Sequence, residues 1–231
     1  MPAAPDRQPI IAIDGPAGAG KSSVAQEVAR RLGLTYIDTG AMYRAVALHA
    51  LRRGIAVDDA PALEELAAAL RMEFRRTDGG QHLFVDGVDV ERAVRDPKVG
   101  AASSPVSAIP GVRHHLTAAQ HAMGRAGGVV MEGRDIGTVV FPDAEVKVFL
   151  TASPAERARR RHAQLVAQSR QDVPPVEEIE REIVERDLRD STRADAPLRQ
   201  AADAVELQTD GLTKDEVVQA IVDLVRGRGA A

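Results

Sequence analysis

The stretch IDGPAGAGKSSVAQEV, from Ile13 to Val28, decides the fold of this chain. It matches the pattern G-x-x-x-x-G-K-[ST] at every fixed position, and these positions are filled by Gly15, Gly20, Lys21 and Ser22. A short apolar run over residues 10–13 precedes the pattern, as expected of a buried strand. Apolar residues then recur at helical spacing from Val24 to Leu32. A strand, a glycine-rich loop and a helix in this order are the context that the pattern requires.

The chemistry of such a loop explains why so many of its side chains are small. Without β-carbons, successive backbone N–H groups can turn inward around a phosphate, and the N-terminus of the following helix adds partial positive charge. Lys21 is then expected to reach the β- and γ-phosphates, and the Ser22 hydroxyl to bind Mg²⁺. An ordinary turn is the alternative, but a turn does not require this spacing. The stretch therefore predicts a nucleoside triphosphate site.

The composition of the whole chain narrows its class. Its 231 residues are enough for one domain, or for one domain with insertions, and a formal net charge of -4 gives no overall attraction to nucleic acid or anionic membranes. It contains no cysteine, which excludes disulfides and thiol chemistry. The N-terminal MPAAPDRQ lacks the basic and apolar regions of a secretory signal, and no apolar run approaches membrane-spanning length. We therefore expect a cytoplasmic protein with no membrane and no nucleic-acid partner.

Five short apolar segments alternate with helical patterns along the chain. They lie at residues 10–13, 35–37, 128–131, 144–150 and 204–207. Such alternation predicts an α/β fold with one five-stranded parallel sheet flanked by helices. Ligands of these sheets bind at the carboxyl ends of the strands, where the glycine loop, Asp38 and the pair Arg134–Asp135 fall.

A different pattern interrupts this alternation. Residues 72–90 alternate apolar and polar side chains around an Asp-Gly-Gly turn, which predicts a small antiparallel β insert. We therefore expect a phosphate-loop core of residues 1–40 and 126–231. A nucleoside-monophosphate-binding region over residues 41–125 would contain the insert.

The rest of the sequence separates the classes of protein that carry a phosphate loop. A GTPase should contain D-x-x-G and N-K-x-D, and neither pattern occurs. A remodelling ATPase usually has an apolar strand that ends in adjacent acids, whereas VVMEGRD offers Glu132 and Asp135. A small-molecule kinase needs an arginine-rich acceptor pocket and a cover that excludes water. That need is met by Arg44, Arg134 and the segment 157–193, which is rich in arginine and has no lysine.

Four motifs in order carry a specific resemblance: IDGPAGAGKSS, DTGAMYRAVAL, EGRDIGTVVFPDAEVKVFL and ERDLRDSTRADAPL. Together they resemble the bacterial cytidylate kinases of the long-insert type, in the P-loop nucleoside monophosphate kinase family, from Ile10 to about Leu207. The resemblance implies a P-loop kinase fold with a β insert and an arginine-rich lid at about residues 157–175. It implies transfer of the γ-phosphate of ATP to CMP or dCMP, with Mg²⁺, by a monomeric enzyme.

The same resemblance implies roles for individual residues. Nine correspond to the ATP phosphate loop: Gly15, Pro16, Ala17, Gly18, Ala19, Gly20, Lys21, Ser22 and Ser23. The expected catalytic set is Lys21, Arg134, Arg157 and Arg161, of which the last two resemble lid arginines over the transferred phosphoryl group. The remaining positions are those of the acceptor: Arg44, Arg134 and Arg193 for its phosphate, Ser104, Arg113 and Asp135 for cytosine, Thr39 for the pocket edge, and Arg186 and Asp190 for the sugar. Glu132 departs from the family pattern, in which aspartate is expected.

Recognition of cytosine also has a basis in the chemistry of these residues. Cytosine presents an N4 amino donor beside the acceptors N3 and O2, whereas uracil exchanges the first two. Asp135 can accept from that amino group while Arg113 and Ser104 donate, and uracil would leave a buried mismatch. Two alternatives remain. One is another small P-loop kinase acting on UMP, AMP or a non-nucleotide acceptor; the other is an RNA- or nucleotide-binding regulatory protein that uses the arginine segment as a phosphate-binding patch.

Several side chains have simple structural interpretations. Thr39 is the expected N-cap of the helix that follows it. Arg159, Arg160 and Arg170 are interpreted as a solvated helix face. Lys147, in the strand segment that precedes the arginine-rich region, is expected at the surface.

Overall fold

The computed structural model describes residues 8–167 and 173–228. The chain divides into two compact units: residues up to Tyr36 together with those from Gly127 onward, and Ile37–Ala126. We name them the phosphate-loop unit and the insert unit. No helix of the described residues is both long and apolar enough to cross a membrane.

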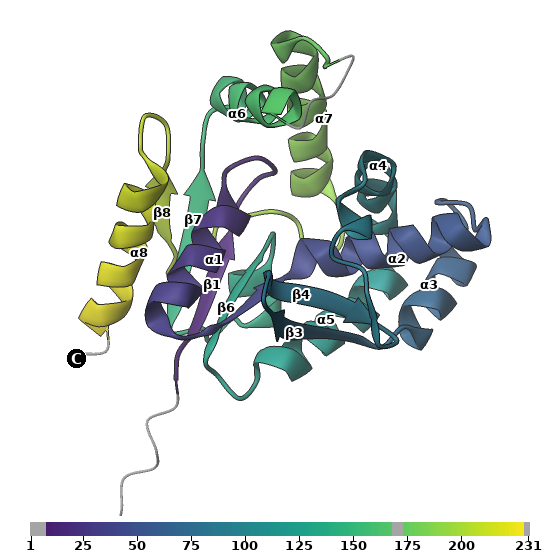
Figure 1. Cartoon of the computed structure of the whole chain (residues 1–231), viewed down its shortest axis with the longest axis horizontal. Coiled ribbons are helices and arrows are strands. Elements are labelled where there is room, and N and C mark those ends of the chain that lie inside the picture. Colours follow the sequence, from purple (N-terminus) through teal and green to yellow (C-terminus); the bar gives the residue numbers. More distant parts are fainter. Residues whose placement is uncertain (1–7, 168–172, 229–231) are drawn as a thin grey trace, which may run out of the picture. The chain divides into compact units, whose positions relative to one another are not determined.

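The phosphate-loop unit is built on one sheet with the strand order β2-β6-β1-β7-β8. Figure 1 labels four of these strands, β6, β1, β7 and β8. The pairs β1–β6, β1–β7 and β7–β8 are parallel, which confirms the predicted α/β sheet. The boundary between the two units falls inside β2. In chain order the elements are β1 (Ile10–Asp14), α1 (Lys21–Leu32), β2 (Thr35–Asp38), β6 (Val129–Gly133), the π-helical turn η2 (Ile136–Val140), β7 (Val146–Thr151), α6 (Pro154–Ala167), α7 (Val176–Thr192), β8 (Val205–Gln208) and α8 (Lys214–Arg228).

The central strands are apolar because both of their faces are covered. All five residues of β1 are buried, and Ile11 is paired in register with Val130 of β6 and Val146 of β7. These side chains share one core with Val28 of α1 and Ile221 of α8. Each fully buried aliphatic side chain of this kind stabilises the fold by about 1.5–3 kcal/mol. A continuous apolar run is the expected sequence of a parallel strand with helices on both sides of its sheet.

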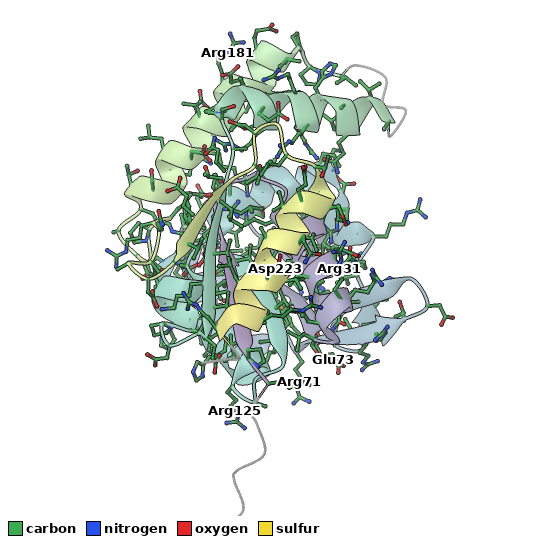
Figure 2. The ribbon with its side chains drawn as sticks, turned by 90° about the vertical axis from the view of Figure 1, so that its left-hand side faces the viewer. Arg31, Arg71, Glu73, Arg125, Arg181 and Asp223 are labelled. Carbon is green, nitrogen blue, oxygen red and sulfur yellow. The ribbon has the colours of Figure 1, made fainter. Side chains whose placement is uncertain are left out.

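Polar side chains also join α1 to α8 at the surface. Arg31 donates to Gln219 at 3.1 Å and pairs with Asp215, and Gln219 donates to Asp223 at 2.9 Å. Figure 2 labels Arg31 on α1 and Asp223 on α8. Exposed ion pairs contribute only about 0–1 kcal/mol. The apolar core beneath the two helices therefore holds them together, and the network adds little.

Helices α6 and α7 form a hairpin that follows β7 (Figure 1). The hairpin has its own small core of Ala158, Leu165, Ile179 and Ile183. The sequence predicts the second helix over residues 176–188, whereas α7 continues to Thr192. Part of the predicted lid, residues 168–172 with Arg170, lies outside the described residues.

The insert unit consists of helices and a small antiparallel sheet. Its elements are α2 (Thr39–Arg53), α3 (Ala60–Ala69), β3 (Met72–Thr77), β4 (Gly80–Val85), β5 (Val88–Asp89), the 3-10 turn η1 (Ala93–Arg95), α4 (Pro97–Val106) and α5 (Pro110–Gly124). Strands β3, β4 and β5 pair in that order and antiparallel, so the predicted β insert is confirmed. One core unites the unit, and Met42, Leu63, Leu83 and Leu116 are among its fully buried members.

Three local predictions are wrong. The N-cap of α2 is Asp38, whose carboxylate accepts from the N–H of Ala41 at 2.8 Å, so that Thr39 is the first helical residue. Lys147 is buried, because its ammonium binds the carboxylate of Asp203 while its stem lies beside Gly137.

The third concerns the arginines of α6. Arg159 is exposed, as expected, with a side chain that is 66% accessible. Arg160 is not part of a purely solvated face, since its guanidinium donates to the hydroxyl and the carbonyl of Thr209 at 2.9 and 2.7 Å. This contact ties α6 to the chain that follows β8.

Candidate active site

The glycine loop between β1 and α1 has a backbone that other residues would not fit. At Gly15, a β-carbon would lie 2.0 Å from the carbonyl oxygen of Leu150, so the strand end packs directly against β7. Gly20 caps α1 with a φ of 90°, in the left-handed region that favours glycine. Lys21 begins the helix, and its Nζ donates back to the carbonyl of Pro16 at 2.8 Å. The loop therefore closes around its own lysine.

Lys21 lies in an environment that disfavours its charge until an anion arrives. Its pKa is lowered from 10.5 to about 7, first by burial and then by the positive charge of Arg134, while Glu132 and Asp14 act in the opposite direction. Lys21 as a whole is 6% exposed. A phosphate bound in the loop would add negative charge and restore the protonated lysine. This electrostatic balance suits a site for a polyanion.

Two carboxylates lie near the ends of the adjacent strands β1 and β6, those of Asp14 and Glu132. Both act on the charge of Lys21. The hydroxyl of Tyr36 donates to Glu132 Oε1 at 2.5 Å, and all three side chains are buried. The carboxylate of Asp14 accepts from the N–H groups of Ile136 and Gly137 at 2.8 and 2.7 Å. Glu132, which departs from the family pattern, is thus held by a hydroxyl from the neighbouring strand β2.

The phosphate-loop unit brings together five of the predicted acceptor residues. Arg134 Nε donates to Asp190 Oδ2 at 3.0 Å, and Arg193 Nη2 lies 3.8 Å from Asp135 Oδ1. Burial alone would raise the pKa of Asp190, but Arg134, Arg186 and Arg193 outweigh it and hold the pKa below its ordinary value. Arg134 and Asp135 follow β6, and the other three come from α7 and its C-cap. Positive charge is concentrated at this end of the sheet.

Arg157 and Arg161 occupy very different surroundings on α6. Arg157 is 3% exposed, and its guanidinium donates to Ala152 O at 2.9 Å, to Ala17 O at 3.0 Å and to Asp187 Oδ2 at 2.5 Å. It therefore joins the phosphate loop to the base of the α6–α7 hairpin. Arg161 is exposed and donates to Gln164 at 2.8 Å.

In the insert unit, Asp38 organises two arginines. Its Oδ2 accepts from Arg44 Nη2 at 2.9 Å and lies 3.3 Å from Arg95 Nη2, while Oδ1 caps α2. Burial raises the pKa of Asp38, but the two arginines overcome this effect and hold it below its ordinary value. The buried Nε of Arg44 has no hydrogen-bond partner among the described residues. Arg44 is thus oriented by one carboxylate and keeps donor capacity.

The predicted cytosine-reading residues of this unit lie on neighbouring helices. Arg113 on α5 is 2% exposed, its guanidinium lies 5.7 Å from the ring centre of Tyr43, and it donates to Ser107 O at 3.4 Å. Ser104 on α4 and Thr39 on α2 are also buried. Asp135 belongs to the phosphate-loop unit. A fully buried arginine against an aromatic face is a costly arrangement that suits a binding site more than a surface.

Sequence reasoning missed residues that contact the predicted site residues and their neighbours. Asp14, Tyr36 and Asp187 have no predicted role, yet they contact the turn after β6, Glu132 and Arg157, respectively. A signal was available for Asp14, because a carboxylate at the end of an otherwise apolar buried strand needs a partner. Tyr36 and Asp187 carry no such signal, since their partners are distant in the sequence.

The sheet and the glycine loop together give the chain the fold of the P-loop kinases. Shikimate kinase from Bacteroides thetaiotaomicron superposes on 94% of this chain and 98% of its own, with a TM-score of 0.50 at 16% identity, which shows the shared fold alone. The family model for cytidylate kinase matches residues 11–227. The chain belongs to the cytidylate kinase family.

Individual relatives agree with this family. A cytidylate kinase from Solibacter usitatus (strain Ellin6076) is 51% identical over 95% of this chain and 93% of its own length. A bifunctional pantoate ligase/cytidylate kinase from Synechococcus sp. (strain RCC307) is 55% identical over 95% of this chain but 43% of its own. The chain thus spans less than half the length of such bifunctional relatives.

Proposed function

We propose that this protein transfers the γ-phosphoryl group of ATP directly to CMP and dCMP, with ADP and the corresponding diphosphate as products. Membership of the cytidylate kinase family supports the reaction class. The observation that carries the proposal is that the phosphate loop and Arg134 follow two paired strands of one sheet: Asp14, at the end of β1, lies in register with Gly133, which directly precedes Arg134. The charge of Arg134 also lowers the pKa of Lys21, which supports a donor-phosphate lysine and an acceptor arginine at the same end of the sheet, as a direct transfer requires.

The residues of the chain act by positioning and by neutralising charge. An oxygen of the acceptor phosphate attacks the γ-phosphorus while the bond to the β-phosphate oxygen breaks, so that ADP leaves. The acceptor phosphate is already ionised, and the transfer needs no strong general base. Lys21 and the loop N–H groups bind the donor phosphates, and Arg134 and Arg193 bind the acceptor phosphate. Arg157 and Arg161 act from the lid on the transferred group.

The insert unit supplies the acceptor contacts in this proposal. Arg44, held by Asp38, binds the CMP phosphate, and Arg113 with Ser104 reads the cytosine edge while Asp135 accepts from the N4 amino group. Thr39 forms the pocket edge, and Arg186 and Asp190 contact the sugar. The 2% exposure of Arg113 supports a role in recognising the base. A base that cannot pair with a buried charged group binds much more weakly than one that can.

The site residues fit a Mg²⁺ ion that arrives with the nucleotide. Ser22 is exposed at the first turn of α1, so its hydroxyl is available as a hard oxygen ligand. No group of three or more acidic or histidine side chains in the described residues could hold a metal by itself. Phosphate oxygens and water would thus supply most ligands, as is usual for Mg²⁺. When bound, the ion would neutralise charge on the phosphates.

An acceptor panel tests this proposal. ADP formation from ATP is measured with CMP, dCMP, UMP and AMP at equal concentration, with no acceptor as control. Fast turnover with CMP and dCMP is expected, and preference for UMP or AMP would contradict the proposal. RNA binding with a steep salt dependence and no CMP-dependent turnover would favour the regulatory alternative. A cytoplasmic location and a monomeric state are part of the same proposal.

A further inference from the structure

The carboxylate of Asp14 connects two loops that the proposed reaction needs. Asp14 is the last residue of β1, directly before the glycine loop, and is 5% exposed. Its Oδ1 accepts from Ile136 N at 2.8 Å and its Oδ2 from Gly137 N at 2.7 Å. Those N–H groups belong to the turn that directly follows Arg134 and Asp135. One side chain therefore spans from the donor loop to the acceptor-binding pair.

The anchor itself cannot shift. Asp14 pairs in register with Gly133 of β6 and Phe149 of β7, so its backbone is fixed from both sides. The next residue, Gly15, packs so tightly that a β-carbon would meet Leu150 O at 2.0 Å. The carboxylate thus leaves a rigid strand end, which is what a positioning group requires.

The turn, by contrast, has an unusual backbone that needs an external partner. Residues Ile136–Val140 form a single π-helical turn, and Asp135 precedes it with a φ of −147° and a ψ of 23°. The N–H groups of Val139 and Val140 bond to Asp135 O at 2.9 and 3.2 Å. The first N–H groups of any helical turn lack partners within it. At Ile136 and Gly137, both are satisfied by Asp14.

We propose that Asp14 is a positioning residue, whose ionised carboxylate fixes Arg134 and Asp135 relative to the phosphate loop. The proposal rests on the proposed function for the roles of those two residues. Asparagine in its place could accept only one of the two N–H bonds, and its amide group would set a donor against the other. The backbone of Arg134 would then no longer be held in the position that aligns its side chain with the donor phosphates.

The charge state of Asp14 offers a direct readout. Its pKa is raised to about 6, mainly by burial and also by the charge of Asp135, while the N–H groups of Gly137 and Ile136 and the charge of Lys21 act in the opposite direction. Among the other charged groups nearby, Glu132 lies on β6 and acts on Lys21, and the stem of Lys147 on β7 lies beside Gly137. Protonation removes one acceptor, so the turn should respond to pH near this value.

Asp14→Asn and Glu145→Gln form a matched pair for the kinetic test. Glu145 Oε2 also accepts a backbone N–H of β1, that of Ile10 at 2.8 Å, but at the opposite end of the strand. For Asp14→Asn we expect kcat/KM for CMP to fall about ten- to a hundred-fold, with a larger rise in KM for CMP than for ATP and a smaller preference for CMP over UMP. Glu145→Gln should stay within about two-fold of wild type. Unchanged kcat/KM and base preference in folded Asp14→Asn would overturn the proposal.

An NMR titration of the wild-type protein tests the proposal without an activity assay and without depending on whether a variant folds. Backbone amide NMR resonances are followed between about pH 5 and 8, without nucleotide. The amides of Ile136 and Gly137 should shift with a midpoint near 6, and those of Arg134 and Asp135 should move with them. If the amide resonances of Arg134 and Asp135 stay fixed, or if none of the four amide resonances moves, Asp14 does not position these two residues. Failure of the wild type to phosphorylate CMP would instead contradict the proposed function alone.

Discussion

Arg134 and Asp190 are joined by a hydrogen bond of 3.0 Å between Nε and Oδ2, with side chains that are 20% and 8% exposed. The bond links the end of β6 to the last turns of α7. It places the guanidinium of Arg134, which we propose binds the acceptor phosphate, at the base of the α6–α7 hairpin. Any movement of α7 would therefore also reorient the side chain of Arg134.

A double-mutant cycle on this pair is the first prediction. Arg134→Met and Asp190→Asn should each lower kcat/KM for CMP, because each removes an opposite charge that is hydrogen-bonded to a mostly buried partner. The double variant should lose less than the product of the two single losses, with a coupling of about 0.5–3 kcal/mol. Arg134→Met combined with the distant Glu145→Gln should show no coupling. Strict additivity for Arg134 and Asp190 would mean that the bond does not contribute to function.

Proton uptake on ATP binding is the second prediction. Because the pKa of Lys21 in the free protein is about 7, the lysine is mostly neutral at pH 8, and bound phosphates should protonate it. Calorimetric titrations at pH 8 in buffers of different ionisation enthalpy should show close to one proton taken up per ATP. Lys21→Met should abolish this uptake. An equal enthalpy in all buffers for the wild type would show that Lys21 is already charged.

The stability of the free protein should follow the same shift. The folded Lys21 binds fewer protons than the unfolded chain between its lowered pKa of about 7 and its ordinary 10.5. Its contribution to the free energy of unfolding therefore rises with pH in this window. In denaturant titrations, the difference between wild type and Lys21→Met should shift in favour of the wild type between pH 7 and 9.5.

The third prediction separates two roles of Asp38: capping α2 and holding Arg44. Asparagine is as good an N-cap as aspartate, whereas alanine loses about 0.5–2 kcal/mol of stability. Asp38→Asn should therefore keep the cap of α2 but release Arg44 from its carboxylate. We expect KM for CMP to rise about ten-fold in both variants. The free energy of unfolding should fall appreciably more in Asp38→Ala, and a normal KM in Asp38→Asn would contradict the positioning of Arg44.

Base reading and phosphate binding should respond differently to mutation, which is the fourth prediction. Arg44→Met should weaken CMP and UMP by similar factors, since both acceptors carry the same phosphate. Arg113→Met should penalise CMP by about ten- to a hundred-fold and UMP less, because UMP never satisfied that pocket. The measurement is kcat/KM with both acceptors. A change in the CMP/UMP ratio for Arg44→Met but not for Arg113→Met would reverse the two assignments.

Local patterns predicted much of this fold because they report local physics. The glycine spacing from Gly15 to Gly20 encodes a backbone path, and the apolar run before it encodes a strand buried on both faces. The alternation around residues 72–90 encodes a sheet with one exposed face. Each of these features depends on neighbours in the sequence, so one chain is enough to read it.

The supporting contacts depend on residues far apart, and the sequence alone did not reveal them. Nothing near Tyr36 indicates that its hydroxyl meets Glu132, and the burial of Lys147 depends on Asp203. The N-cap of α2 was assigned one residue too late, because Asp38 and Thr39 are both good caps and the choice depends on which backbone is extended. Side chains that hold other side chains were therefore the main omission.

The central claim is direct transfer from ATP to CMP, and phosphorus NMR of a single reaction mixture tests it most directly. With equal ATP and CMP, the signals of ADP and of the new CDP β-phosphate should grow together in a ratio of about one to one, and inorganic phosphate should stay at the level of a protein-free control. Lys21→Met should abolish both signals. Growth of ADP and inorganic phosphate without CDP would show an ATPase and contradict the account.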